Sequence, residues 1–363
     1  MRKLFNLFWI SVFIIGSVIP LFHMNTAEIT EQENRTLEKF PEMKKGKEFN
    51  LNYGKEFESW LGDRFGGRGA IIFLNVSIHY LLNEHYQANN TVKGKNDWMF
   101  SIRKDNSVNL SKDGIASLKK LKELCDKNKI KLFVIIPPHS VDIYTEYYPL
   151  PYNGQINKAT SDFLMDKNSF VTLLGENFKK AKDKKLFFKK DPHWTDEGAL
   201  IAYKKFIQEF KKVYPNALDY NSKDFKILSI PQENYMRDGV SINGFCKSLG
   251  VNYSIFCHSD FYPYYIYKGE IEEEKVGAWK WGAKKFLNKN GYPLKIMLLG
   301  KSYTSSFNVF LSAYFREVIR LDMNSLYSNK VPSIKPYWNF IQMEKPDVLI
   351  LLLHAGQISI NLI

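Results

Sequence analysis

The stretch Ile296-Met297-Leu298-Leu299-Gly300-Lys301-Ser302-Tyr303 sets the fold class, because an uninterrupted apolar run stops at a glycine and leads into a helical pattern at 304–314. Short, fully apolar runs are typical of strands that are buried on both faces. Similar runs occur at 132–136, 318–321 and 348–353. Helical patterns alternate with them, so we expect a mostly parallel sheet between two helical layers, a three-layer α/β/α domain.

Ser302 is expected at the edge of this sheet where ligands bind, beyond the carboxyl ends of the strands. Gly300 permits a sharp turn there, and backbone amides at the start of the next helix can face a developing oxyanion. A serine at a helix start is also a common helix cap. The Gly-Lys-Ser triplet is not a phosphate-binding loop, because the first glycine of that motif would fall at Lys295.

A second segment, Asp191-Pro192-His193-Trp194-Thr195, precedes an amphipathic helix expected at 196–212 with Thr195 as its cap. An Asp that orients an imidazole is two-thirds of a nucleophilic triad, and Ser302 supplies the missing hydroxyl. The alternatives are a surface histidine or a metal ligand pair. No other His or Cys cluster completes a metal site, so we expect neither a metal nor a cofactor.

The composition limits the class of protein but does not identify a binding partner. The 363 residues are 45% hydrophobic, which is enough for one large core, and the net charge of +13 comes from lysines spread over the chain. Such a charge favours an acidic surface or polymer, for example a uronate or a teichoic acid. Nucleic acid is not an expected partner, because no nucleic-acid-binding motif accompanies the charge.

The N-terminus predicts a membrane anchor at 1–24. After Arg2 and Lys3, a stretch of about 19 residues from Leu4 to Phe22 carries no charged side chain, long enough to span a bilayer as a helix. The positive flank predicts a cytoplasmic N-terminus and an extracytoplasmic body, at the cell surface or in the periplasm. A cleaved signal peptide is the alternative, but residues 19–24 are a poor cleavage site.

Residues 25–100 are expected to form a spacer, two helices between 53 and 86 broken at Gly66-Gly67, and a hairpin at 92–100 with Asn96-Asp97 at its turn. The α/β domain follows at 101–363, with 220–290 as an insertion near the site. Of the three cysteines, Cys246 and Cys257 could pair in an oxidising compartment, whereas Cys125 has the helical spacing of a core residue.

The segment Asp191-x-His193-Trp194, followed by Glu197-Gly198-Ala199, is similar to the signature of the alginate O-acetyltransferases and related DHHW-type proteins. These form a permuted branch of the SGNH hydrolase-like fold. Their nucleophile motif, usually Gly-Asp-Ser-Phe or Gly-Thr-Ser-Tyr, resembles Gly300-Lys301-Ser302-Tyr303. Three supporting segments also match this family, namely Glu33-Asn34-Arg35, Gly94-Lys95-x-x-Trp98-Met99-Phe100 and Lys345-Pro346-Asp347-Val348.

By this resemblance Ser302 is the nucleophile, His193 the general base and then acid, and Asp191 its orienter. The oxyanion and substrate-binding positions are Ser302, Tyr303, Gly300 and Trp194. Trp194 is also expected to pack against the site as part of its wall. The chain departs from the family pattern twice. Lys301 replaces a small or acidic residue, and His354-Ala355-Gly356-Gln357 stands where the family often has a Glu-Arg pair.

The resemblance implies an O-acetyltransferase that acts on an exported polysaccharide through an acetyl-serine intermediate, with the acetyl group supplied by a multispanning membrane acyltransferase. Two alternatives remain open. A carbohydrate acetyl esterase would use the same triad with water as the acceptor. A noncatalytic polysaccharide-binding or assembly protein would keep the fold without turnover.

Overall fold

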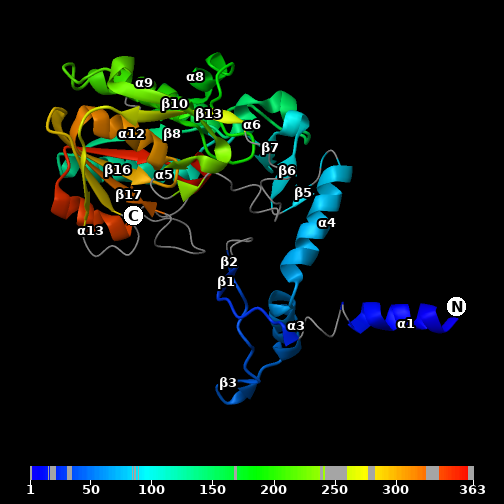
Figure 1. Ribbon diagram of the computed structural model, residues 1–363. Helices are drawn as coiled ribbons and strands as arrows, with labels where there is room; N and C mark the ends of the chain where they lie inside the picture. The colour runs from blue at the N-terminus through cyan, green and yellow to red at the C-terminus, as the bar shows by residue number, and fades with distance from the viewer. Residues whose placement is uncertain are drawn as a thin grey trace. The chain divides into compact units, whose positions relative to one another are not determined.

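The computed structural model describes residues 2–14, 16, 22–30, 35–83, 85, 87–88, 90–166, 170–237, 240–241, 260–276, 283–323 and 335–358 (Figure 1). These residues fall into two compact units, one within Met1–Lys93 and one within Gly94–Ile242 and Ser259–Ile363. The boundary thus lies at Gly94. Of the predicted domain boundaries, the one at residue 100 lies closest to it.

The first unit contains the two helices that the sequence predicts. Helix α3 ends at Arg64 and α4 begins at Arg68, and Gly67 between them has a φ of +75°, which favours glycine. The described elements of this unit are α1 (Arg2–Phe13), β1 (Ile29–Thr30), β2 (Arg35–Thr36), β3 (Lys44–Lys45), β4 (Glu48–Phe49), α3 (Tyr53–Arg64), α4 (Arg68–Leu82), β5 (Gln87–Ala88) and β6 (Thr91–Lys93).

The membrane anchor at 1–24 stays a prediction, because residues 15 and 17–21 lie outside the described part of the chain. Helix α1 is 12 residues long. In the described ranges, no single helix has the length and apolar character to cross a bilayer, whereas α3 and α4 together meet that criterion across an 80° bend. Glu33 and Asn34 of the family-like segment also lie outside the described residues.

The second unit is built on a seven-stranded mixed sheet, as expected for the predicted α/β domain. Strands β17, β16, β18, β8 and β9 run parallel, and β14 and β15 extend the sheet antiparallel at one edge. In sheet order the strands are β14 (Glu272–Lys275), β15 (Lys284–Leu287), β17 (Phe315–Asp322), β16 (Tyr292–Gly300), β18 (Val348–Leu352), β8 (Lys131–Ile136) and β9 (Val171–Leu173).

Helices cover both faces of this sheet, so the predicted three layers are present. Alternate residues of β8 show why: Leu132 and Val134 pack in one core cluster with Leu118 of α5, whereas Phe133 points to Phe206 of α9 on the other face. Figure 1 shows α9 above the sheet and α13 below it. The main helices are α5 (Lys112–Lys127), α7 (Lys158–Met165), α8 (Gly175–Lys180), α9 (Asp196–Lys211), α12 (Thr304–Tyr314) and α13 (Lys335–Glu344).

Asp347 aligns the strands at their amino ends. Its backbone N–H donates to the carbonyl of Lys295 at 3.0 Å, its side chain accepts from the Lys295 N–H at 2.7 Å, and its carbonyl accepts from the Lys131 N–H at 2.9 Å. The family-like segment Lys345-Pro346-Asp347-Val348 therefore fixes the register of β18 between β16 and β8. The carboxyl ends of these three strands consequently lie side by side.

The predicted insertion at 220–290 contains two different structures. Strands β10 (Phe225–Pro231) and β13 (Phe261–Tyr267) form a separate antiparallel ribbon, whereas β14 and β15 belong to the main sheet. These edge strands are rich in Glu and Lys, so they lack the apolar run by which the buried strands were found. The remaining short elements are η2 (Lys95–Asp97), β7 (Met99–Ser101), α6 (Ser140–Ile143), η3 (Thr145–Tyr147), η4 (Ser222–Asp224), η5 (Gln232–Asn234), β11 (Met236–Arg237), β12 (Val240–Ser241) and α14 (Ala355–Ile358).

Smaller predictions have mixed outcomes. Asn96 and Asp97 adopt φ values of 53° and 61°, so the chain turns there as expected. Cys125 is a buried free thiol in the core, as its spacing predicts. Cys246 and Cys257 lie outside the described residues, and their pairing stays a prediction.

Candidate active site

Ser302 follows the carboxyl end of β16, where the sequence places it. Gly300 is the last residue of the strand and pairs with Leu352 of β18 on one side and Asp322 of β17 on the other. A Cβ on Gly300 would lie 2.2 Å from the carbonyl oxygen of Leu352, so only glycine fits between the strands. The chain then turns through Lys301-Ser302-Tyr303 and enters α12 at Thr304. The φ of Gly300 is not positive, so its backbone conformation does not require glycine. The requirement comes from the close approach of the two strands.

Asp191 and His193 lie in the loop that leads into α9. The Asp191 carboxylate is fully buried and accepts the backbone N–H of His193 at 2.9 Å, which closes a local turn. Two residues later the Thr195 side chain caps α9 by accepting the N–H of Gly198 at 3.2 Å. Because the loop is held at both points, the His193 ring has little freedom.

The side chains of Asp191, His193 and Ser302 form one continuous hydrogen-bonded relay. Nδ1 of His193 lies 2.5 Å from Oδ1 of Asp191, and Nε2 of the same ring lies 2.6 Å from Oγ of Ser302. A carboxylate only accepts, so Nδ1 carries the proton and Nε2 offers its lone pair to the Ser302 hydroxyl. The His193 side chain is 18% exposed, and the relay can therefore be reached from solvent.

Electrostatics favour His193 as a proton acceptor. Burial opposes a charge on the ring, but the negative charge of Asp191 and its hydrogen bond outweigh burial and raise the pKa of His193. The charge of Asp322 acts in the same direction. A raised pKa makes the imidazole a stronger base toward the Ser302 hydroxyl.

Tyr303 and Trp194 tie the two loops together. The Tyr303 hydroxyl donates to the carbonyl of Pro192, and the indole Nε1 of Trp194 donates to the carbonyl of Tyr303 at 3.1 Å. Trp194 is only 1% exposed, so it packs as a wall. Its expected role in packing agrees with this burial, and its expected role in substrate binding stays a prediction.

Two backbone amides are available for an oxyanion. Among the described residues, no group accepts a hydrogen bond from the N–H of Ser302 or of Tyr303, and both precede the first residue of α12. Donors at a helix start stabilise negative charge without having to reorganise. The side chain of Tyr303 is buried and supports the loop through its bond to Pro192.

Sequence reasoning missed three polar residues beside the relay, Arg103, His139 and His354. The rings of His139 and His354 stack with centroids 3.9 Å apart, and the Tyr303 ring meets His354 edge-on at 4.6 Å. The charge of Arg103 acts on both imidazoles. Only the departure from the family pattern at 354–357 could have drawn attention to His354, and nothing local marks the other two.

Lys301 is half-buried beside the nucleophile. Burial lowers the pKa of its ammonium group, and the nearby charge of Asp322 partly opposes that shift. No hydrogen bond or ion pair joins Nζ to another residue of the described chain. A cation therefore stands close to Ser302 at a position where the family usually has a small or acidic residue.

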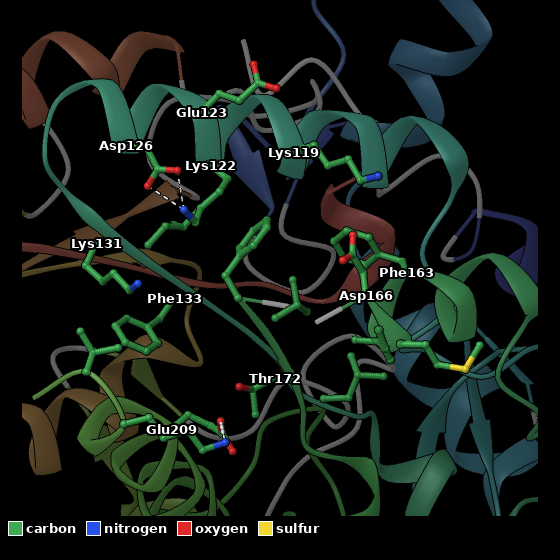
Figure 2. Close-up of a pocket in the computed structure, with 18 of the residues that line it drawn as sticks. Lys119, Lys122, Glu123, Asp126, Lys131, Phe133, Phe163, Asp166, Thr172 and Glu209 are labelled. Atoms are coloured by element: carbon green, nitrogen blue, oxygen red, sulfur yellow. Dashed lines mark hydrogen bonds and ion pairs between the residues drawn. The ribbon is translucent and has the colours of Figure 1, made fainter. Parts of the chain in front are cut away.

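A groove of about 1090 Å³ lies elsewhere in this unit, along the β9 edge of the sheet (Figure 2). Lysines and acidic residues line it, and several of them neutralise each other, for example Lys122 with Asp126 and Lys205 with Glu209. Neither Ser302 nor His193 borders this groove. Its size alone therefore does not make this groove the candidate active site.

Comparisons with known proteins confirm the predicted SGNH hydrolase-like fold. The family model described as an SGNH hydrolase-like domain, acetyltransferase AlgX, matches residues 91–326, which include Asp191, His193 and Ser302. Bacillus cereus PatB1, solved with a sulfonyl adduct, is similar at 11% identity over 74% of this chain and 97% of its own, with a TM-score of 0.52. A DHHW family protein from Eubacterium siraeum is similar at 16% identity over 77% of this chain and 98% of its own, with a TM-score of 0.52. At these identities the likeness shows the fold. No curated protein matches the chain.

Proposed function

Because this chain belongs to the family of SGNH hydrolase-like acetyltransferase domains that includes AlgX, we propose that it is an O-acetyltransferase acting on an exported cell-surface or extracellular polysaccharide. The observation that carries the proposal is the relay from Asp191 through His193 to Ser302, with separations of 2.5 and 2.6 Å. Such a relay is the arrangement that activates a serine hydroxyl for acyl transfer.

In the first half-reaction, Nε2 of His193 takes the proton of the Ser302 hydroxyl while Oγ attacks the carbonyl carbon of the acetyl donor. The carbonyl oxygen becomes negative and is stabilised by the N–H groups of Ser302 and Tyr303. When this intermediate collapses, the bond to the leaving group breaks and His193 returns the proton to that group. The product is acetyl-Ser302, and Asp191 keeps the ring oriented and stabilises its transient positive charge.

In the second half-reaction, a sugar hydroxyl gives its proton to Nε2 of His193 and its oxygen attacks the acetyl carbon. Collapse breaks the bond to Oγ, and the proton on His193 returns to Ser302. Water can attack in the same way, which is the esterase alternative. A sugar hydroxyl competes with water at roughly 55 M only when binding gives it a high effective concentration.

We further propose that the N-terminal segment 1–24 anchors the chain, with the catalytic unit on the extracytoplasmic side, and that a multispanning membrane acyltransferase supplies the acetyl group. Support comes from the charge-free stretch that follows Arg2 and Lys3. If the chain is anchored in this way, its catalytic unit would meet the membrane acyltransferase that supplies the acetyl group at the bilayer surface. The positive net charge of +13 would also hold an anionic glycan nearby.

The test uses the full chain in detergent with p-nitrophenyl acetate as the donor. We expect a burst of p-nitrophenol and a mass increase of one acetyl group located on the peptide that contains Ser302. Cello-oligosaccharides and polygalacturonate then serve as neutral and anionic acceptors, and mass spectrometry detects acetylated product. Fast hydrolysis without acetylated product on either polymer would favour the esterase, and the absence of an acetyl-enzyme would favour a noncatalytic protein.

A further inference from the structure

Ser302 and His354 occupy equivalent positions on neighbouring strands. Gly300 at the end of β16 pairs with Leu352 at the end of the parallel strand β18, so each side chain lies two residues beyond a paired position. His139 follows the end of the next strand, β8. The same edge of the sheet therefore carries the nucleophile and two histidines that the relay does not use.

The hydrogen bonds of His354 define which ring nitrogen can bind a ligand. Nδ1 lies 3.2 Å from the carbonyl oxygen of Pro137, which only accepts, so Nδ1 carries the proton and Nε2 keeps a lone pair. No described group hydrogen-bonds to this Nε2, and the His354 residue is only 8% exposed. His354 thus presents a hydrogen-bond acceptor that has no partner among the described residues.

The surroundings hold this ring in place. His139 stacks on one face at 3.9 Å, and the edge-on Tyr303 ring lies 4.6 Å away. The backbone of His139 is itself fixed, because its N–H donates to Oδ2 of Asp142 at 2.7 Å. Tyr303 also lies against His193, with ring centroids 5.5 Å apart, so one tyrosine separates the two imidazoles.

The surroundings also keep His354 neutral. Burial lowers its pKa to about 3, and the positive charge of Arg103 acts in the same direction. The pKa of His193 is shifted the opposite way, upward. Two imidazoles near one nucleophile are therefore held in different states, one as a base and one as a permanently neutral acceptor.

We propose that Nε2 of His354 binds a hydroxyl group of the acceptor sugar adjacent to the hydroxyl that attacks acetyl-Ser302. The attacking hydroxyl gives its proton to His193, while the second hydroxyl donates a hydrogen bond to His354 and fixes the orientation of the sugar. The ligand class is thus a polyol with neighbouring hydroxyls. This inference rests on the proposed function, since it concerns the second half-reaction.

Two substitutions separate a binding role from a structural one. Asn at position 354 can place an amide N–H where Nδ1 stands and keep the bond to Pro137, but it provides no acceptor at Nε2. Gln can provide an acceptor near Nε2 but loses the bond to Pro137. His354→Asn and His354→Gln are therefore matched variants, each removing one of the two contacts of the ring.

The experiment measures how acetyl-Ser302 partitions between water and an added acceptor. The full chain in detergent is acetylated with p-nitrophenyl acetate, and either methyl glucoside, with several hydroxyls, or ethanol, with one, is added. We expect His354→Asn to lower the ratio of transfer to hydrolysis about tenfold for methyl glucoside, the effect of one lost hydrogen bond. The ratio of transfer to hydrolysis for ethanol should fall much less than the ratio for methyl glucoside, and His354→Gln should keep most of the transfer to methyl glucoside.

Three outcomes would overturn the inference. His354→Asn could transfer acetyl to methyl glucoside as well as the unsubstituted protein does. Both variants could lose the burst and transfer to either acceptor together, which would indicate a structural role for the ring. If the unsubstituted protein formed no acetyl-enzyme, the proposed function itself would fail and this inference with it, a result distinct from the other two.

Discussion

Nε2 of His193 lies 2.6 Å from Oγ of Ser302, although 109 residues of the chain separate the two side chains. The contact depends on the loops that carry them, because the Tyr303 hydroxyl bonds to the carbonyl of Pro192 and the Trp194 indole bonds to the carbonyl of Tyr303. These two hydrogen bonds therefore help to hold the base at the nucleophile. Activity and stability should respond differently to changes at these positions.

Ser302→Ala should abolish the acetyl-enzyme and the p-nitrophenol burst while leaving the fold intact. Within the described residues the hydroxyl makes one hydrogen bond, to His193, and it does not cap α12, so its loss should cost only about 1 kcal/mol. Intact-protein mass spectrometry and urea unfolding measure the two effects. Ser312→Ala is the matched control, because it removes a buried hydroxyl that lies within α12 and donates to the carbonyl of Asn308. Acetylation that persists in Ser302→Ala would exclude this serine as the nucleophile.

Asp191→Asn should reduce the rate of acetyl-enzyme formation by roughly 10³ to 10⁴. The carboxylate accepts from both Nδ1 and the backbone N–H of His193, and an amide would stabilise the wrong tautomer of the ring. Stopped-flow measurement of the burst gives the rate. A decrease of less than tenfold would show that Asp191 does not orient His193.

The pH dependence of kcat/KM should show one ascending limb set by His193. The pKa of this ring is raised above its ordinary value of 6.5, since the charge of Asp191 outweighs burial. Only the neutral ring can take the proton of Ser302, so activity should rise with pH through a midpoint above 6.5. His354→Asn should leave this midpoint in place. A limb centred below 6.5 would contradict the direction of the shift.

Much of the fold could be predicted because its central strands are buried on both faces and read as continuous apolar runs at 132–136, 296–299 and 348–353. Ser302 could be placed because ligand sites follow such strands. Asp191 and His193 could be named because their spacing matches a family signature. The edge strands β14 and β15 escaped detection because half-exposed strands rich in Glu and Lys carry no comparable signal.

His139 and His354 could not be predicted as a pair. They are separated by more than half of the chain, and their contact depends on the register of β8 with β18. Neither residue has a local motif, and a single histidine after a strand has many uses. The two rings stay neutral because the packed chain buries them, and a sequence pattern does not show which side chains become buried together.

Stability should fall in acid partly because His139 and His354 are buried in the neutral form. Their pKa values are lowered in the folded state, His354 to about 3, so the unfolded chain binds more protons below its own His pKa near 6.5. Their contribution to the free energy of unfolding is complete above that pH and is lost as the pH falls toward 3. Urea unfolding between pH 8 and pH 4 measures the loss.

His139→Phe is the control that separates this effect from the protonation of carboxylates. Phenylalanine keeps a ring against His354 but cannot ionise. We expect its free energy of unfolding to fall less between pH 8 and pH 4 than that of the unsubstituted protein. Equal losses in the two proteins would show that His139 does not contribute to the acid sensitivity.

Gly300→Ala should affect both stability and chemistry. The new Cβ would lie 2.2 Å from the carbonyl oxygen of Leu352 and 2.7 Å from Cγ2 of Thr304, so β16 must move away from β18. Overpacking of this kind typically costs about 1 to 3 kcal/mol, which urea unfolding would detect. Because Ser302 follows directly, the same movement displaces Oγ from Nε2 of His193, and a shift of about 1 Å can reduce the rate roughly 100-fold. Gly356→Ala is the matched control, since no heavy atom lies within 4 Å of its added Cβ. An acetylation rate in Gly300→Ala equal to that of the control would mean that Ser302 does not depend on the close approach of these two strands.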